Sequence, residues 1–189
     1  MSEQMSSGIR AGARMRGAGM LLIGVAGTLA LIGYAPEARS EAPAACTAAE
    51  YRQFDFWLGD WDAFDYPVKA PAVARTIITS LLGGCAVHEQ YDGTNGLHGR
   101  SYSIFDKAHA AWHQTWVTSR GRLLLLDGKW SGGRLVMTGN TAGADGRAAV
   151  TRVSWWKVPE GVRELGETSV DGGHGWSVDF DLLFKPHHE

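Results

Sequence analysis

Short runs in which apolar and polar residues alternate extend from residue 54 to the C-terminal end of the chain. A period near two is typical of a strand that has one face on a core and the other in water. The pattern predicts ten strands, at 54–64, 72–82, 86–91, 99–106, 111–118, 123–130, 134–139, 148–158, 162–170 and 176–184. No segment has the pattern of a long amphipathic helix, which argues against an α/β architecture.

The links between the predicted strands are short and rich in Gly, Asp and Asn, as at Gly83-Gly84 and Gly172-Gly173. Such links join neighbouring strands as hairpins, because a parallel crossover needs a dozen residues or more. A meander of this length either closes or leaves exposed edges, and closure removes them. The predicted fold is therefore all-β, an antiparallel up-and-down barrel of about ten strands.

The first forty residues have the pattern of an export signal. Arg10, Arg14 and Arg16 precede an uncharged, largely apolar run at 17–36, and small residues follow near Ser40. We therefore assign 1–40 to a signal peptide, 41–53 to an N-terminal leader with a short helical turn, and 54–189 to the barrel domain. The alternative is an uncleaved membrane anchor, since the apolar run approaches the length that crosses a bilayer.

Export also bears on the two cysteines, Cys46 and Cys85. In an oxidising compartment we expect them to form a disulfide, with two free buried thiols as the alternative. The whole chain has 18 basic and 20 acidic residues, and cleavage after Ser40 removes four basic and two acidic ones. The mature chain then has 14 basic and 18 acidic residues, a net charge of −4. Without a run of Lys or Arg, this chain is a poor partner for nucleic acid or anionic membranes.

We accordingly expect a periplasmic or secreted protein, monomeric or homodimeric, that is not stably inserted in a membrane after signal cleavage. Its expected partner is a small lipophilic or amphipathic molecule.

Eight tryptophans are the oddity of the composition. Indoles that line a barrel make a cavity for flat or apolar ligands, and each N–H can anchor one polar atom. The alternative is that they fill the core. Adjacent strand residues face opposite ways, so either Trp155 or Trp156 points out of the barrel. The tryptophans expected in the ligand-binding wall are Trp57, Trp61, Trp116, Trp155 and Trp176.

Polar residues inside the predicted strands are candidates for the anchor of a ligand's polar head, because burying an unpaired charge is costly. They are Glu89, Gln114, Arg152 and Glu167. If their faces point inward, Arg152 lies between carboxylates in an aromatic cavity. The alternative is that the opposite faces point inward, since a one-residue change of register reverses every assignment. For Gln114, between Trp112 and Trp116, the pattern favours the interior.

The sequence shows no metal-ligand spacing among its seven histidines and no Gly-x-Ser-x-Gly motif. We assign no catalytic residue, no metal and no cofactor, with haem ligation by His174 or the C-terminal histidines as the alternative. The pairs Asp60/Asp62 and Asp179/Asp181 are expected on the wet outer face rather than as a glycosidase pair.

Five motifs occur together along the mature sequence: Phe54-Asp55-Phe56-Trp57-Leu58-Gly59-Asp60-Trp61-Asp62, Gly84-Cys85 with Glu89 following, Trp112-x-Gln114-x-Trp116-Val117, Ser154-Trp155 and Glu167-x-x-x-Asp171-Gly172-Gly173-x-x-Trp176. In this combination the chain resembles, over essentially the whole mature sequence, a family of exported bacterial proteins without an established activity. The resemblance implies a calycin-type, lipocalin-like barrel and little about chemistry. A more distant similarity to fatty-acid-binding and nitrobindin-like barrels lies in Trp57-x-Gly59-x-Trp61, but the glycine-rich continuation of nitrobindins is missing, which argues against haem.

These patterns predict an exported protein that holds a hydrophobic or amphipathic molecule in an aromatic-lined barrel. Two alternatives belong to other classes of function. One is a hydrolase or isomerase that uses Glu89, Arg152 and Glu167 inside the cavity. The other is an interaction module of the cell envelope, in which exposed Trp and Leu residues form a docking patch.

Overall fold

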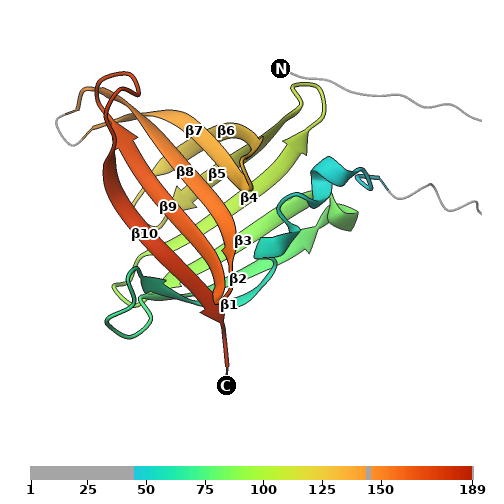
Figure 1. Ribbon diagram of the computed structural model, residues 1–189, viewed down its shortest axis with the longest axis horizontal. Coiled ribbons are helices and arrows are strands. Elements are labelled where there is room, and N and C mark those ends of the chain that lie inside the picture. Colours follow the sequence, from blue (N-terminus) through green and yellow to red (C-terminus); the bar gives the residue numbers. More distant parts are fainter. Residues whose placement is uncertain (1–44, 144–145, 189) are drawn as a thin grey trace, which may run out of the picture. The chain divides into compact units, whose positions relative to one another are not determined.

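The computed structural model describes residues 45–143 and 146–188, so the predicted signal peptide and residues 41–44 of the leader lie outside the described part. Ten antiparallel strands form a closed barrel in which β10 pairs with β1 (Figure 1). The all-β, up-and-down barrel is thereby confirmed. Its strands are β1 (Gly59–Asp65), β2 (Ala74–Leu81), β3 (Ala86–Gly93), β4 (His98–Asp106), β5 (Ala111–Thr118), β6 (Leu123–Ser131), β7 (Arg134–Ala142), β8 (Ala148–Val158), β9 (Gly161–Ser169) and β10 (Ser177–Pro186).

In the described part of the chain, three short 3₁₀ helices accompany the strands: η1 (Ala49–Arg52), η2 (Asp55–Trp57) and η3 (Leu82–Gly84). The first of them is the helical turn expected in the leader. In the described ranges, the chain has no helix with both the length and the apolar character needed to span a bilayer.

The opening motif of the domain begins as a helical turn rather than as a strand. Strand β1 starts only at Gly59, so the prediction of a strand from residue 54 is wrong at its N-terminal end. The three-residue repeat of η2 places Phe54 and Trp57 on one side of the turn. Both rings are fully buried and stack with their centroids 4.9 Å apart. Burial of these two rings thus outweighs the period-two pattern of the motif.

Aromatic side chains fill the end of the barrel where β1 begins. The Phe54 ring contacts the rings of Trp112 and Trp155 edge-on at 5.6 and 5.4 Å, and Trp57 contacts Phe184 at 6.0 Å. We call these five residues the plug. Since η2 supplies two of its rings, the N-terminal segment closes this end of the barrel.

A disulfide holds the N-terminal segment in place. Cys46 is bonded to Cys85, which directly follows η3, and Arg52 donates a hydrogen bond to the carbonyl oxygen of Gly84. The predicted disulfide is confirmed. Bonds of this kind are typical of proteins that fold in an oxidising compartment outside the cytoplasm.

Side chains alternate between the lumen and the outer surface along each strand. On β8, Trp155 is buried inside the barrel, while Trp156 lies outside with the Arg134 guanidinium 4.2 Å from its ring centre. This confirms that one of the two adjacent tryptophans points outward. Asp60 and Asp62 lie on the outer face, as predicted, and contact Arg75 and His187.

Replacing both cysteines by alanine is expected to lower the free energy of unfolding by about 4 kcal/mol, because the closed loop of some forty residues restricts the unfolded chain. Urea unfolding followed by tryptophan fluorescence measures the change. Reductant should destabilise the wild type by a similar amount and leave the double variant unaffected. Equal unfolding midpoints for wild type and variant would contradict the stabilising role of the bond.

Candidate functional site

A cavity of about 530 Å³ lies inside the barrel and opens at the end opposite the plug. Its walls are formed mainly by residues of β3, β5, β6 and β8 to β10, and its rim by the β3–β4 and β5–β6 hairpins. Cavities that bind small molecules in proteins have this size. The closed barrel is therefore hollow at one end and filled at the other.

Three aromatic rings line the cavity: Tyr91, Trp116 and Phe180. Trp116 and Phe180 each cover a glycine of the adjacent strand. A Cβ atom at Gly99 would lie 2.0 Å from the Trp116 ring, and one at Gly166 would lie 2.1 Å from the Phe180 ring. A side chain at either position would push the ring away from the wall. These two glycines thus let the rings lie against the sheet and leave the lumen open.

Glu89 and Gln114 supply the polar part of the cavity wall, in a network that crosses β3, β4 and β5. Glu89 is only 5% exposed and accepts a 2.9 Å hydrogen bond from Ser101. Gln114 donates to the hydroxyl oxygens of Ser103 at 3.1 Å and Ser101 at 3.5 Å. Burial raises the pKa of Glu89 to about 7, against the smaller opposing effects of the Ser101 hydrogen bond and the Arg100 charge.

A second carboxyl group, Glu164 of β9, also lines the cavity. Burial, and after it the charge of Glu89, raises the pKa of Glu164 well above its ordinary value. Trp155 occupies the paired position on β8 and opposes this rise, although its indole N–H makes no hydrogen bond of good geometry. Glu164 is partly exposed although it is strongly desolvated. The two observations agree because its accessible surface lies in the cavity wall.

Sequence reasoning missed Glu164 and selected Glu167 of the same strand instead. The signal that could have identified it is Val162, a buried residue two positions earlier, because side chains two apart share a face. Leu165, an apolar residue two positions before Glu167, indicated instead that Glu167 faces inward, but Leu165 lies on the outer side.

Arg152 and Glu167 lie on the outer surface of the barrel. Arg152 stands between Thr151 and Val153, which both line the cavity, so its side chain points away. It forms an ion pair with Glu167 of the neighbouring strand β9 at 2.8 Å, and its guanidinium lies 3.9 Å from the ring centre of Trp176. The expected inward cluster with Arg152 between carboxylates is therefore wrong, and the alternative register applies to this pair.

Of the five tryptophans predicted to line the cavity, only Trp116 does so. Trp57 and Trp155 belong to the plug, and Trp61 donates its indole N–H to the main-chain oxygen of Trp57 at 2.9 Å. Trp176 stacks on Arg152 outside. The structure thus brings Glu89, Gln114 and Trp116 together at the cavity, and core filling accounts for Trp57, Trp61 and Trp155. A ligand-binding role for any of the predicted residues stays a prediction.

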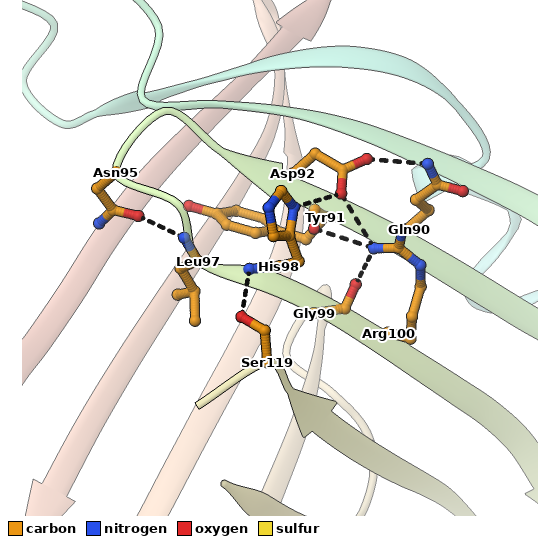
Figure 2. A network of polar contacts seen from close by, with 9 residues as sticks. All are labelled: Gln90, Tyr91, Asp92, Asn95, Leu97, His98, Gly99, Arg100 and Ser119. Carbon is orange, nitrogen blue, oxygen red and sulfur yellow. Dashed lines mark hydrogen bonds and ion pairs between the residues drawn. The ribbon is translucent and has the colours of Figure 1, made fainter. Parts of the chain in front are cut away.

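A polar network on the outer face fixes the hairpin that forms part of the cavity rim (Figure 2). Asp92 accepts hydrogen bonds from Gln90 at 2.9 Å and Arg100 at 3.2 Å, and contacts His98 at 2.9 Å. These contacts hold the pKa of Asp92 below its ordinary value, and the hydrogen bond from Gln90 has the largest effect. Arg100 also donates to the main chain at both ends of the hairpin. The rim at 93–97 is therefore held by several interactions.

Within the ranges that the structure covers, no three His, Cys, Asp or Glu side chains lie close enough together to hold a metal ion. Comparison of the chain with protein-family models and with curated proteins finds no match. The barrel is consistent with a calycin-like fold, while the resemblance to the exported lipocalin-like family stays a prediction.

The raised pKa of Glu89 makes stability depend on pH. Between the ordinary value of 4.5 and about 7, the folded state binds the proton and the unfolded state releases it, so stability falls as the pH rises through this window. Glu89→Gln keeps an acceptor for Ser101 and removes the buried charge. At about pH 8 we expect it to raise the free energy of unfolding, by at most about 3 kcal/mol, and to give no gain near pH 4.5.

Urea unfolding at both pH values measures this difference, with Glu160→Gln in the exposed β8–β9 turn as the control. A loss of stability at the higher pH, or an equal change in the control, would contradict the assignment.

Proposed function

We propose that this protein acts in the periplasm or outside the cell and binds a small amphipathic molecule inside its barrel. The observation that carries the proposal is the cavity, in which the rings of Tyr91, Trp116 and Phe180 face the buried polar groups of Glu89 and Gln114. An apolar wall with a few placed polar groups is the usual composition of a small-molecule site. The disulfide and the export pattern of residues 1–40 support the location.

The barrel geometry favours uptake from one end only. The plug fills the end formed by the N-terminal segment, so a ligand enters between the β3–β4 and β5–β6 hairpins. The apolar part of the ligand contacts the three aromatic rings of the cavity, together with Leu124 and Leu126 in the same wall. Its polar part reaches the network of Glu89, where burial strengthens each hydrogen bond. Analogy with calycin barrels, most of which bind small molecules, points in the same direction.

Acid–base catalysis is a second candidate, favoured by the raised pKa of Glu89 and Glu164. A carboxyl group with a pKa near neutrality can both donate and accept a proton under physiological conditions. The catalytic set differs from that expected from the sequence, because Arg152 and Glu167 lie outside. Turnover of a substrate that is lost in Glu164→Gln, while binding persists, would favour this candidate over simple binding.

Calorimetric titration with naphthylethanol, a neutral molecule with an aromatic body, tests the binding proposal. Trp116→Ala is expected to weaken binding about tenfold, because the ligand loses much of the apolar area it covers. Gly99→Val should have a similar effect, since it displaces the Trp116 ring. The matched control is Trp156→Ala, which removes an indole from the outer face and should leave the affinity unchanged. No binding to the wild type, or equal losses in Trp116→Ala and Trp156→Ala, would refute the proposal.

A further inference from the structure

Acidic side chains are concentrated on one side of the cavity. Glu89, Glu164, Asp65 and Asp179 all line it, and they come from β3, β9, β1 and β10, which lie on one half of the barrel together with β2. Among the described residues, the basic side chains in the lining are those of the β5–β6 hairpin, which are exposed at the rim. Asp65 and Asp179 are exposed near the mouth, so the cavity carries negative charge from its mouth to its deep part at Glu89 and Glu164, and positive charge only at its mouth.

Neither of the two deepest carboxyl groups forms an ion pair in the part of the chain that the structure describes, and the charge of Arg100, on the outer face, has a smaller effect on Glu89 than burial does. Arg152, Arg163 and Arg75 form their ion pairs on the outer face. Glu89 is bonded to Ser101, and Glu164 interacts electrostatically with Glu89. Two carboxyl groups that repel each other in a desolvated site are costly to maintain. This arrangement calls for a positive charge that the protein does not itself supply.

An independent observation comes from β8. The Thr151 side chain is 1% exposed and lines the same cavity, and its hydroxyl has no hydrogen-bond partner among the described residues. Buried hydroxyl groups are generally satisfied, so one that faces a cavity without a partner points to a ligand atom. Thr151 thus indicates a ligand atom farther from the plug than Glu164, because it lies four residues along β8 from Trp155, the partner of Glu164.

We infer that the cavity binds a small primary amine, with its ammonium group held by Glu89 and Glu164 and its apolar body against Tyr91 and Trp116. The inference rests on the proposed binding function and specifies the class of ligand. An ammonium group has three N–H donors and no acceptor, which suits the carboxylate oxygens of the two glutamates. Hydrogen bonds between a cation and carboxylates are the strong ones.

The surrounding rings favour the same ligand. Aromatic faces attract cations, most strongly where water is excluded, and Tyr91 and Trp116 form part of the same wall. Burial, and then the charges of Glu164 and Glu89, raises the pKa of Tyr91 to about 12, so its phenol stays neutral. A bound cation would also lower the raised pKa of both glutamates, since it attracts their ionised forms.

Three ligands that share one aromatic body test the inference: naphthylethylamine, naphthylethanol and naphthylacetate, titrated calorimetrically at about pH 8. The amine should bind at least about tenfold more tightly than the alcohol, because it gains charge-assisted hydrogen bonds, and the carboxylate should bind most weakly. Equal affinity for amine and alcohol would overturn the amine inference and leave the binding proposal standing. If none of the three binds, both fail.

Substitutions in the cavity wall test which side chains cause the preference for the amine over the alcohol. The double substitution Glu89→Gln and Glu164→Gln should abolish the preference for the amine over the alcohol, and urea unfolding followed by tryptophan fluorescence checks that the variant is folded. The matched control is Glu167→Gln on the outer face, which should retain the full preference. An amine preference that survives the double substitution would refute the assigned site.

Discussion

Packing of the aromatic plug into one end of the barrel is the constraint on which the rest of the interior depends. A ten-stranded barrel is wide enough that side chains from its strands alone leave space, and η2 supplies Phe54 and Trp57 to fill that space at one end. The disulfide of Cys46 ties the segment to Cys85. With this end sealed, the remaining lumen is shielded from water on all sides but one, and Glu89 becomes strongly desolvated as a consequence.

The open half of the lumen is maintained at some cost in stability. Gly99 and Gly166 give up side-chain packing so that Trp116 and Phe180 lie flat on the sheet. Glu89 and Glu164 occupy positions where apolar side chains would pack without any desolvation penalty. A chain selected for stability alone would fill this space. Sites where local choices disagree with the stable packing of a fold are commonly functional, and here the disagreements surround one cavity.

The period-two pattern was sufficient to predict the strands, the closure and, with the export signal, the disulfide. It failed where a strand carries mixed residues on both faces. Gln114 is buried as predicted, because large indoles flank it on one face. Leu165 and Trp156 are apolar residues on the outer face, so Glu167 and Arg152 have the same apparent pattern as inward residues, and the alternative register is the one that applies to them. Register on such strands is set by neighbours across the sheet, which a single sequence does not reveal.

Local irregularities caused the other errors. A bulge in β10 between Val178 and Phe180 shifts the register, so Asp179 lines the cavity while Asp181 pairs with Arg163 outside. The two aspartates, two positions apart, were expected on the same outer face. At the start of the domain, two aromatic rings three residues apart favoured a helical turn over a strand. Neither feature follows from alternation alone, because each depends on what the side chains meet inside the barrel.

The distribution of the tryptophans changes what their number implies. Trp57, Trp112 and Trp155 fill the plug, and Trp156 and Trp176 stack on arginines of the outer surface. Trp116 alone of the eight lines the cavity. A tryptophan-rich composition therefore reflects mainly how this barrel is filled and covered, and it says little about selectivity. Since apolar contacts discriminate weakly between ligands of similar shape, the selectivity of the cavity depends on its few polar groups, and above all on the two glutamates in its wall.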